Sequence, residues 1–340
     1  MSVWIRLVYE VLPLVTSVIV PLGVLLHYWR RADARPVPAR PAPTEGAPVP
    51  PWTSAARAQL RRTRVAGILA TAAVLASSFG LISPNRWGME WHDFLTPLLS
   101  VLLCTAVLLT RPPAMRRYAT PTASAGSEPH GTRPAHPPIS LGARWWFAAW
   151  GIAMTVLVLS VVWAGLLSAP DGNGDYTLHS VELGQTTGST SIAGWYFGVP
   201  VIISALLVAA LVLSALRWQA TPPLAADAGQ DIWLRRAATR SLLSLSGGAV
   251  VVTLGWVLLS IGNAAQMTLS GPSAEDGGMV TVGSPLAPIG VVVRVLGLLL
   301  QGVGLALMLL SLFSRLAPRP ELARHDEPTV GHPEPETVAS

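Results

Sequence analysis

The sequence predicts an all-α polytopic integral membrane protein with seven transmembrane helices, its N-terminus outside and its C-terminus inside. Three observations support this prediction. Apolar residues make up 51% of the 340 residues and charged residues only 12%, a profile that is rare in soluble domains of this length. Seven runs are long and apolar enough to cross a hydrocarbon core about 30 Å thick. The connections between them are alternately arginine-rich and acidic.

The seven predicted spans are separated by polar or proline-rich connections. The third is the shortest, because Pro97 stands in its first turn, yet its core LLSVLLCTAVLLT carries no charge. A cleaved signal peptide is the alternative for the first run, with the small residues 32–34 as cleavage site. Signal peptides carry their charges before the apolar run, whereas Arg30 and Arg31 follow this one. We place the spans near 7–28, 65–83, 94–110, 146–168, 195–216, 243–265 and 289–314.

Arginine distribution orients these spans. Twenty of the 23 arginines lie in the connections 30–64, 111–144 and 217–240 and in the tail from residue 315, whereas the opposite connections contain only Arg86. Connections rich in arginine stay on the cytoplasmic side of a membrane, which places the N-terminus outside. The positive charge therefore predicts anionic lipid headgroups on the cytoplasmic face as a partner, and not nucleic acid.

The cytoplasmic connections are rich in proline and cannot bury enough apolar surface to fold, so we expect them to be disordered. The exception is 54–64, where a serine cap opens a helix that runs into the second span. The predicted organisation is a first helix (1–29), a Pro/Arg-rich linker ending in a short helix (30–64), a hairpin (65–110), a linker (111–144), a hairpin (145–217) with outer loop 169–193, a linker (218–241), a hairpin (242–314) with outer loop 270–288, and a tail (315–340).

Several functional classes are excluded by composition. The sequence contains no lysine, which a Walker A loop or a retinal Schiff base requires. Its one cysteine, Cys104, can form neither an intrachain disulfide nor a cysteine zinc cluster. No Asp, Glu or His stands at mid-membrane, which disfavours an ion-coupled transporter. Arginine with abundant Ala, Pro and Gly is typical of a GC-rich bacterial genome, so we expect a bacterial plasma-membrane protein.

The stretch DGNGDYTLHSVE, 171–182, has two interpretations. Its oxygen-bearing side chains have the EF-hand ligand spacing, so calcium is the one ion that the sequence suggests, and we expect no other cofactor. Against this, Tyr176 stands in sixth place, where a sharp turn requires glycine. The alternative is a turn followed by an exposed strand over 176–183. The candidate calcium ligands are Asp171, Asn173, Asp175 and Glu182, with Thr177 and His179 between them.

Three further features concern the outer side. The loop 270–288 also contains a turn and the β-prone run MVTV, so pairing it with the loop 169–193 predicts one small β cap over the bundle. Glu90, His92 and Asp93 cluster between the second and third spans, where they, with His179, suggest either a metal site or simply a polar interfacial loop. Near the same side, Glu10 and Arg294 are candidates for an ion pair.

A stripe of small residues marks the sixth span. Ser241, Gly248, Gly255 and Gly262 recur every seven residues, and such stripes let a second membrane helix approach closely. We expect the seventh span as the partner, because it offers a matching set of small residues: Gly297, Gly302, Gly304 and Ala306.

These patterns predict a non-catalytic multi-pass protein, working as a membrane partner or permease-like subunit of a larger assembly with other membrane proteins. An outward-facing sensor that binds a ligand or ion through its outer loops is the alternative. A third hypothesis, an enzyme acting on lipid, rests only on Glu90, His92 and Asp93. Unchanged function after alanine substitution of all three would remove it.

Overall fold

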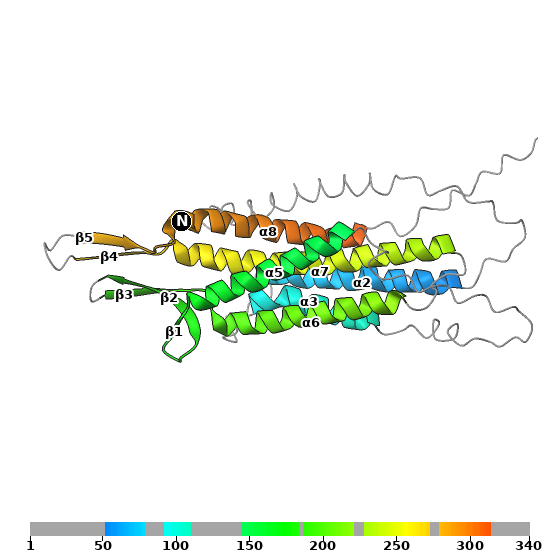
Figure 1. Ribbon diagram of the computed structural model, residues 1–340, viewed down its shortest axis with the longest axis horizontal. Helices are drawn as coiled ribbons and strands as arrows, with labels where there is room; N and C mark the ends of the chain where they lie inside the picture. The colour runs from blue at the N-terminus through cyan, green and yellow to red at the C-terminus, as the bar shows by residue number, and fades with distance from the viewer. Residues whose placement is uncertain are drawn as a thin grey trace, which may run out of the picture.

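The computed structural model is mostly helical and describes residues 52–78, 92–109, 144–183, 186–220, 228–272 and 279–313. In these ranges, helices run along one long axis and two small sheets lie at one end (Figure 1). The predicted first span and the predicted tail lie outside the described residues. The helices are α2 (Trp52–Ser78), α3 (His92–Leu109), α5 (Arg144–Leu166), α6 (Trp195–Ala220), α7 (Ala228–Ala265) and α8 (Ala287–Phe313).

Among the described residues, four helices are long and apolar enough to cross a membrane: Trp145–Leu166, Trp195–Arg217, Arg235–Ala265 and Ala287–Ser311. The apolar parts of α2 and α3 are shorter, at Val65–Ser77 and Phe94–Leu109. The sequence predicted two full spans there. The second prediction extends to residue 83, beyond the described part of α2, and the third was the shortest of the seven.

Consecutive helices alternate in direction. As a result, the arginine-bearing ends of α2, α6 and α7 lie at the same end of the bundle. The N-terminal ends of α2 and α7 and the C-terminal end of α6 lie opposite the sheets (Figure 1). These ends carry Arg61 and Arg62, Arg235 and Arg236, and Arg217. The predicted helix over 54–64 is confirmed, because α2 begins at Trp52 and continues without a break into its apolar part.

The core of the bundle surrounds α7, which contacts each of the other described helices. Three of its buried hydroxyl groups, those of Ser244, Ser246 and Thr253, donate to backbone carbonyl groups, which offsets the cost of burying them. The Ser246 hydroxyl donates to the Leu242 carbonyl at 2.8 Å, and the Thr253 hydroxyl donates to the Phe94 carbonyl of α3 at 3.5 Å. Local hydroxyl bonds of this kind let a helix with many serines occupy the centre.

Small residues bring α7 and α8 into backbone contact. A Cβ atom at Gly248 would lie 2.7 Å from the carbonyl oxygen of Gly304, and one at Gly255 would lie 2.7 Å from that of Gly297. At Gly262, a Cβ atom would meet the backbone nitrogen of Arg294 at 2.6 Å. The predicted packing of the glycine stripe is confirmed, and we call this contact the glycine seam.

The outer loops form strands as predicted, but the expected shared sheet is wrong. Strands β1 (Ala169–Pro170), β2 (Tyr176–Leu183) and β3 (Thr186–Ser191) form one antiparallel sheet, and β4 (Thr268–Pro272) pairs with β5 (Met279–Gly283) in another. Each strand pairs with its neighbour in the chain, because closing a short loop costs the least entropy. The two sheets lie against each other: a Cβ atom at Gly188 of β3 would lie 3.0 Å from Leu269 Cδ1 of β4.

Candidate functional site

We call the two hairpins and the turn before β2, the described parts of 168–193 and 266–286, the β cap. The β cap extends along the long axis beyond the helix ends (Figure 1). It contains every predicted calcium ligand and His179. Two of its apolar side chains stand exposed, Tyr176 at the start of β2 and Met279 at the start of β5.

The turn before β2 is organised by one carboxylate. Asp171 Oδ1 accepts hydrogen bonds from the backbone N–H of Asn173 at 2.8 Å and of Asp175 at 3.0 Å, and Oδ2 accepts from the Thr177 hydroxyl at 3.3 Å. The two backbone donors lower the pKa of Asp171. Gly174 has a φ of 89°, a conformation that favours glycine. The sequence DGNGD therefore forms a turn stabilised by its own first side chain.

The strand interpretation of 171–182 is confirmed. Asp171, Asn173 and Asp175 share one turn, but β2 is extended from Tyr176, and a strand rising about 3.3 Å per residue places Glu182 roughly 23 Å along from Asp175. Tyr176 does not make the sharp turn of an EF-hand, because no described residue other than glycine has a positive φ. Nowhere in the described ranges do three His, Cys, Asp or Glu residues gather as a metal site. Calcium binding by the turn stays a prediction.

His179 joins the β cap to the helices. Its side chain is buried, with Nδ1 3.3 Å from the Leu167 carbonyl oxygen and Nε2 3.3 Å from the Ser284 hydroxyl oxygen. With the proton on Nδ1, the ring donates to Leu167 and accepts from Ser284. Leu167 follows α5 and Ser284 precedes α8, so one imidazole joins β2 to the ends of two helices.

Ser284 extends this junction. Its backbone N–H donates to the Met267 carbonyl at 3.0 Å, just after α7. Its hydroxyl oxygen accepts from the N–H of Leu286 at 3.3 Å, and its carbonyl accepts from the N–H of Ala287 at 2.9 Å, which begins α8. A second link comes from Ser260 of α7, whose hydroxyl accepts the N–H of Ala193 at 2.8 Å. The β cap is therefore fixed to the ends of α5, α7 and α8.

From the sequence, His179 was identified only as a candidate metal ligand. Ser284 and Ser260 were not identified as functional residues. The signal for Ser284 was present, since Ser-Pro before an apolar run is typical of a helix start. Of the other predicted metal ligands, His92 and Asp93 lie in the first turn of α3 and Glu90 lies outside the described residues. The Arg294 side chain is exposed although its backbone lies against Gly262 of α7, and its suggested partner Glu10 also lies outside the described residues.

Comparisons with protein-family models, with curated protein sequences and with solved structures find no match for this chain.

Proposed function

We propose that the chain is a seven-span protein of a bacterial plasma membrane, with its N-terminus outside and its C-terminus inside. It acts without catalysis, as a membrane-embedded subunit of a larger assembly. The gathering of Arg61, Arg217 and Arg235 at helix ends opposite the β cap supports this orientation, since arginine-rich ends stay in the cytoplasm. Tags on residues 1 and 340 are expected in opposite compartments, and tags in the same compartment would contradict the topology.

The outer face of α5 carries the proposal of a membrane partner. Four large apolar side chains on this helix are each more than half exposed, and they recur every seven residues: Trp145, Ile152, Leu159 and Leu166. Between them stand the small exposed residues Ala148, Ala149 and Thr155. Large side chains alternating with small ones on one stripe suit the packing of a second helix.

Photo-crosslinking tests this function. With benzoylphenylalanine in place of Ile152, irradiation of intact membranes is expected to give a discrete adduct with another polypeptide. The comparison position is Val292 of α8, which is 67% exposed against 64% for Ile152. Lipid adducts alone at both positions would contradict a role as a membrane partner.

A second function, outward-facing binding, is favoured by the projecting β cap with exposed Tyr176 and Met279. Its calcium form has a direct test: terbium bound at the turn should luminesce when Tyr176 or Trp195 is excited. The double variant Asp171→Ala/Asp175→Ala should abolish the signal. Silence of the wild-type protein at millimolar terbium would end the calcium hypothesis.

A further inference from the structure

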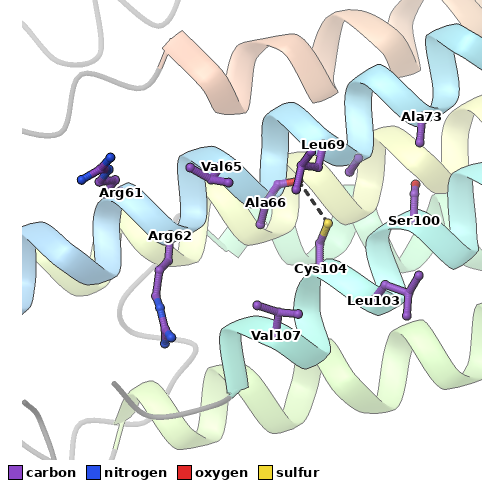
Figure 2. A pocket seen from close by; sticks show the side chains of 11 residues that line it. Arg61, Arg62, Val65, Ala66, Leu69, Ala73, Ser100, Leu103, Cys104 and Val107 are labelled. Carbon is purple, nitrogen blue, oxygen red and sulfur yellow. Dashed lines mark hydrogen bonds between the residues drawn. The ribbon is translucent and has the colours of Figure 1, made fainter. Parts of the chain in front are cut away.

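A groove of about 570 Å³ runs between α2 and α3 on the outside of the bundle (Figure 2). Val65 and Leu69 of α2 and Leu103 and Val107 of α3 line it, and all four apolar side chains are largely exposed. Its floor is closed by Cys104, whose thiol donates to the Ala66 carbonyl of α2 at 3.0 Å. This hydrogen bond joins the two helices beneath an apolar groove that is large enough for a ligand.

One end of the groove is strongly basic. Arg61 and Arg62 line it there, one helical turn before the apolar part of α2 begins at Val65. Figure 2 shows their side chains at this end, pointing to different sides of α2. Among the described residues, none of those that line the groove is acidic. The groove is therefore cationic at one end. Beyond that end its lining is almost entirely apolar, and the Ser100 hydroxyl lies among the apolar side chains.

The length of the apolar part fits one leaflet of a membrane. From Val65 to Ala73 the groove follows α2 for eight residue steps, which rise about 12 Å at 1.5 Å per residue. One leaflet of hydrocarbon is about 15 Å thick, half of the bilayer core. A cationic end followed by an apolar trough of this length matches a headgroup and the acyl chain below it.

We infer that the groove binds an anionic glycerophospholipid of the cytoplasmic leaflet, with one acyl chain between α2 and α3 and its phosphate beside Arg61 and Arg62. This inference rests on the orientation in the proposed function. Basic pockets between membrane helices on the cytoplasmic side are suited to anionic headgroups, and guanidinium groups bond phosphate oxygens through several N–H donors.

Charge favours a lipid over a protein segment in this groove. The predicted first span, 7–28, would bring Arg30 and Arg31 at its cytoplasmic end toward Arg61 and Arg62. A second copy packed about a two-fold axis along the membrane normal would bring the same arginines together. Like charges at such distances repel, whereas a phosphate is attracted.

Photo-crosslinking in vesicles of equal parts phosphatidylglycerol and phosphatidylethanolamine tests the inference. Benzoylphenylalanine replaces Leu103 in the groove or, as control, Leu206 on the outer face of α6; these leucines are 65% and 60% exposed. Mass spectrometry then gives the ratio of anionic to zwitterionic lipid adducts. Because each arginine near the surface contributes roughly fivefold in anionic lipid binding, we expect this ratio at Leu103 to exceed that at Leu206 at least fivefold.

Arginine variants identify the source of the preference. Arg61→Gln should lower the ratio at Leu103 roughly fivefold, and Arg61→Lys should retain it, since the charge is kept. Arg236→Gln removes an exposed charge of α7 outside the groove and should change nothing. Elution of each variant as a single species in gel filtration verifies folding.

Three results would overturn the inference: equal lipid ratios at Leu103 and Leu206, a ratio insensitive to Arg61→Gln, or adducts at Leu103 with residues 7–28 or with a second copy. None of them depends on the partner test at Ile152. Failure of that test would contradict the proposed function and leave the lipid site standing, provided that the terminal tags confirm the orientation.

Discussion

The apolar spans of α5 and α7, Trp145–Leu166 and Arg235–Ala265, have the same mean hydropathy, yet they occupy opposite environments. In the most apolar window of α7, 83% of the residues are buried inside the protein, against 22% in that of α5. A bilayer is as apolar as a leucine side chain, so apolar character alone does not draw a helix to the centre. The difference lies in shape: α7 has Gly248, Gly255 and Gly262 on the side that α8 covers, whereas Gly151 of α5 has no described atom within 4 Å.

The largest expected difference is between two glycine-to-alanine substitutions, one in α7 and one in α5. In Gly255→Ala, the new Cβ would meet the Gly297 carbonyl oxygen at 2.7 Å and the Gln301 backbone nitrogen at 2.8 Å, so the two helices must separate. We expect a loss of about 3 kcal/mol in unfolding free energy. Gly151 of α5 has nothing within 4 Å, so Gly151→Ala should stabilise by at most about 1 kcal/mol through helix propensity.

Unfolding in mixed micelles with increasing dodecyl sulfate, followed by circular dichroism, measures both effects. Opposite signs for Gly255→Ala and Gly151→Ala are the expected result. Equal destabilisation by the two variants would mean that the glycine seam does not hold α7 at the centre.

A second pair compares the two faces of α5 itself. Leu157 is fully buried and Leu159 is 62% exposed. Leu157→Ala should lower the unfolding free energy by about 2 kcal/mol, because it leaves a cavity. The contribution from transferring the side chain out of solvent is small in a bilayer. Leu159→Ala should change the unfolding free energy by less than about 0.5 kcal/mol. A similar cost for both, in the same micelle assay, would show that α5 has a second packed face.

A smaller effect is expected where the β cap joins the bundle. His179→Ala leaves the buried Ser284 hydroxyl without its acceptor, at a cost of about 1 to 2 kcal/mol. Amide hydrogen exchange should accelerate at Leu286 and Ala287, whose N–H groups bond Ser284. Ser270→Ala removes an exposed hydroxyl pair with Thr281 and is the control, with less than about 0.5 kcal/mol expected. Unchanged exchange in His179→Ala would contradict the junction.

The smallest effect concerns the exposed turn at Asp171. Its pKa is lowered by the N–H groups of Asn173 and Asp175, so the ionised carboxylate stabilises the turn. This contribution is complete above the ordinary aspartate pKa of about 3.9 and disappears as pH falls through the lowered value. Amide chemical shifts of Asn173 and Asp175 should therefore move at acidic pH below 3.9. Asp171→Asn should remove this titration; its persistence in that variant would assign it to another group.

The sequence was sufficient for features that depend on composition and short-range pattern. Apolar runs, the glycine stripe and the turn at 171–175 each involve residues within a few helical turns or one loop. The strand at 176–183 was also predictable, because β-branched and aromatic residues follow turn residues. Such features were found because their causes lie within one segment of chain.

The rest depends on contacts that no local pattern encodes. His179 and Ser284 are 105 residues apart, and their pairing requires the loop after α5 to meet the start of α8. The predicted shared sheet failed for the same reason: strand propensity does not specify the partner strand. Nor does α2 alone indicate a groove, since its exposed side chains Val65 and Leu69 line one only where α3 lies alongside.

The glycine seam also imposes an order of events during synthesis. α7 is synthesised and reaches the bilayer before α8 has been made. During that time Gly248, Gly255 and Gly262 are not covered by α8 and face lipid or the insertion machinery. A chain that ended between Gly283 and Ala287 would contain α7 without α8, and the three glycines of α7 would stay uncovered.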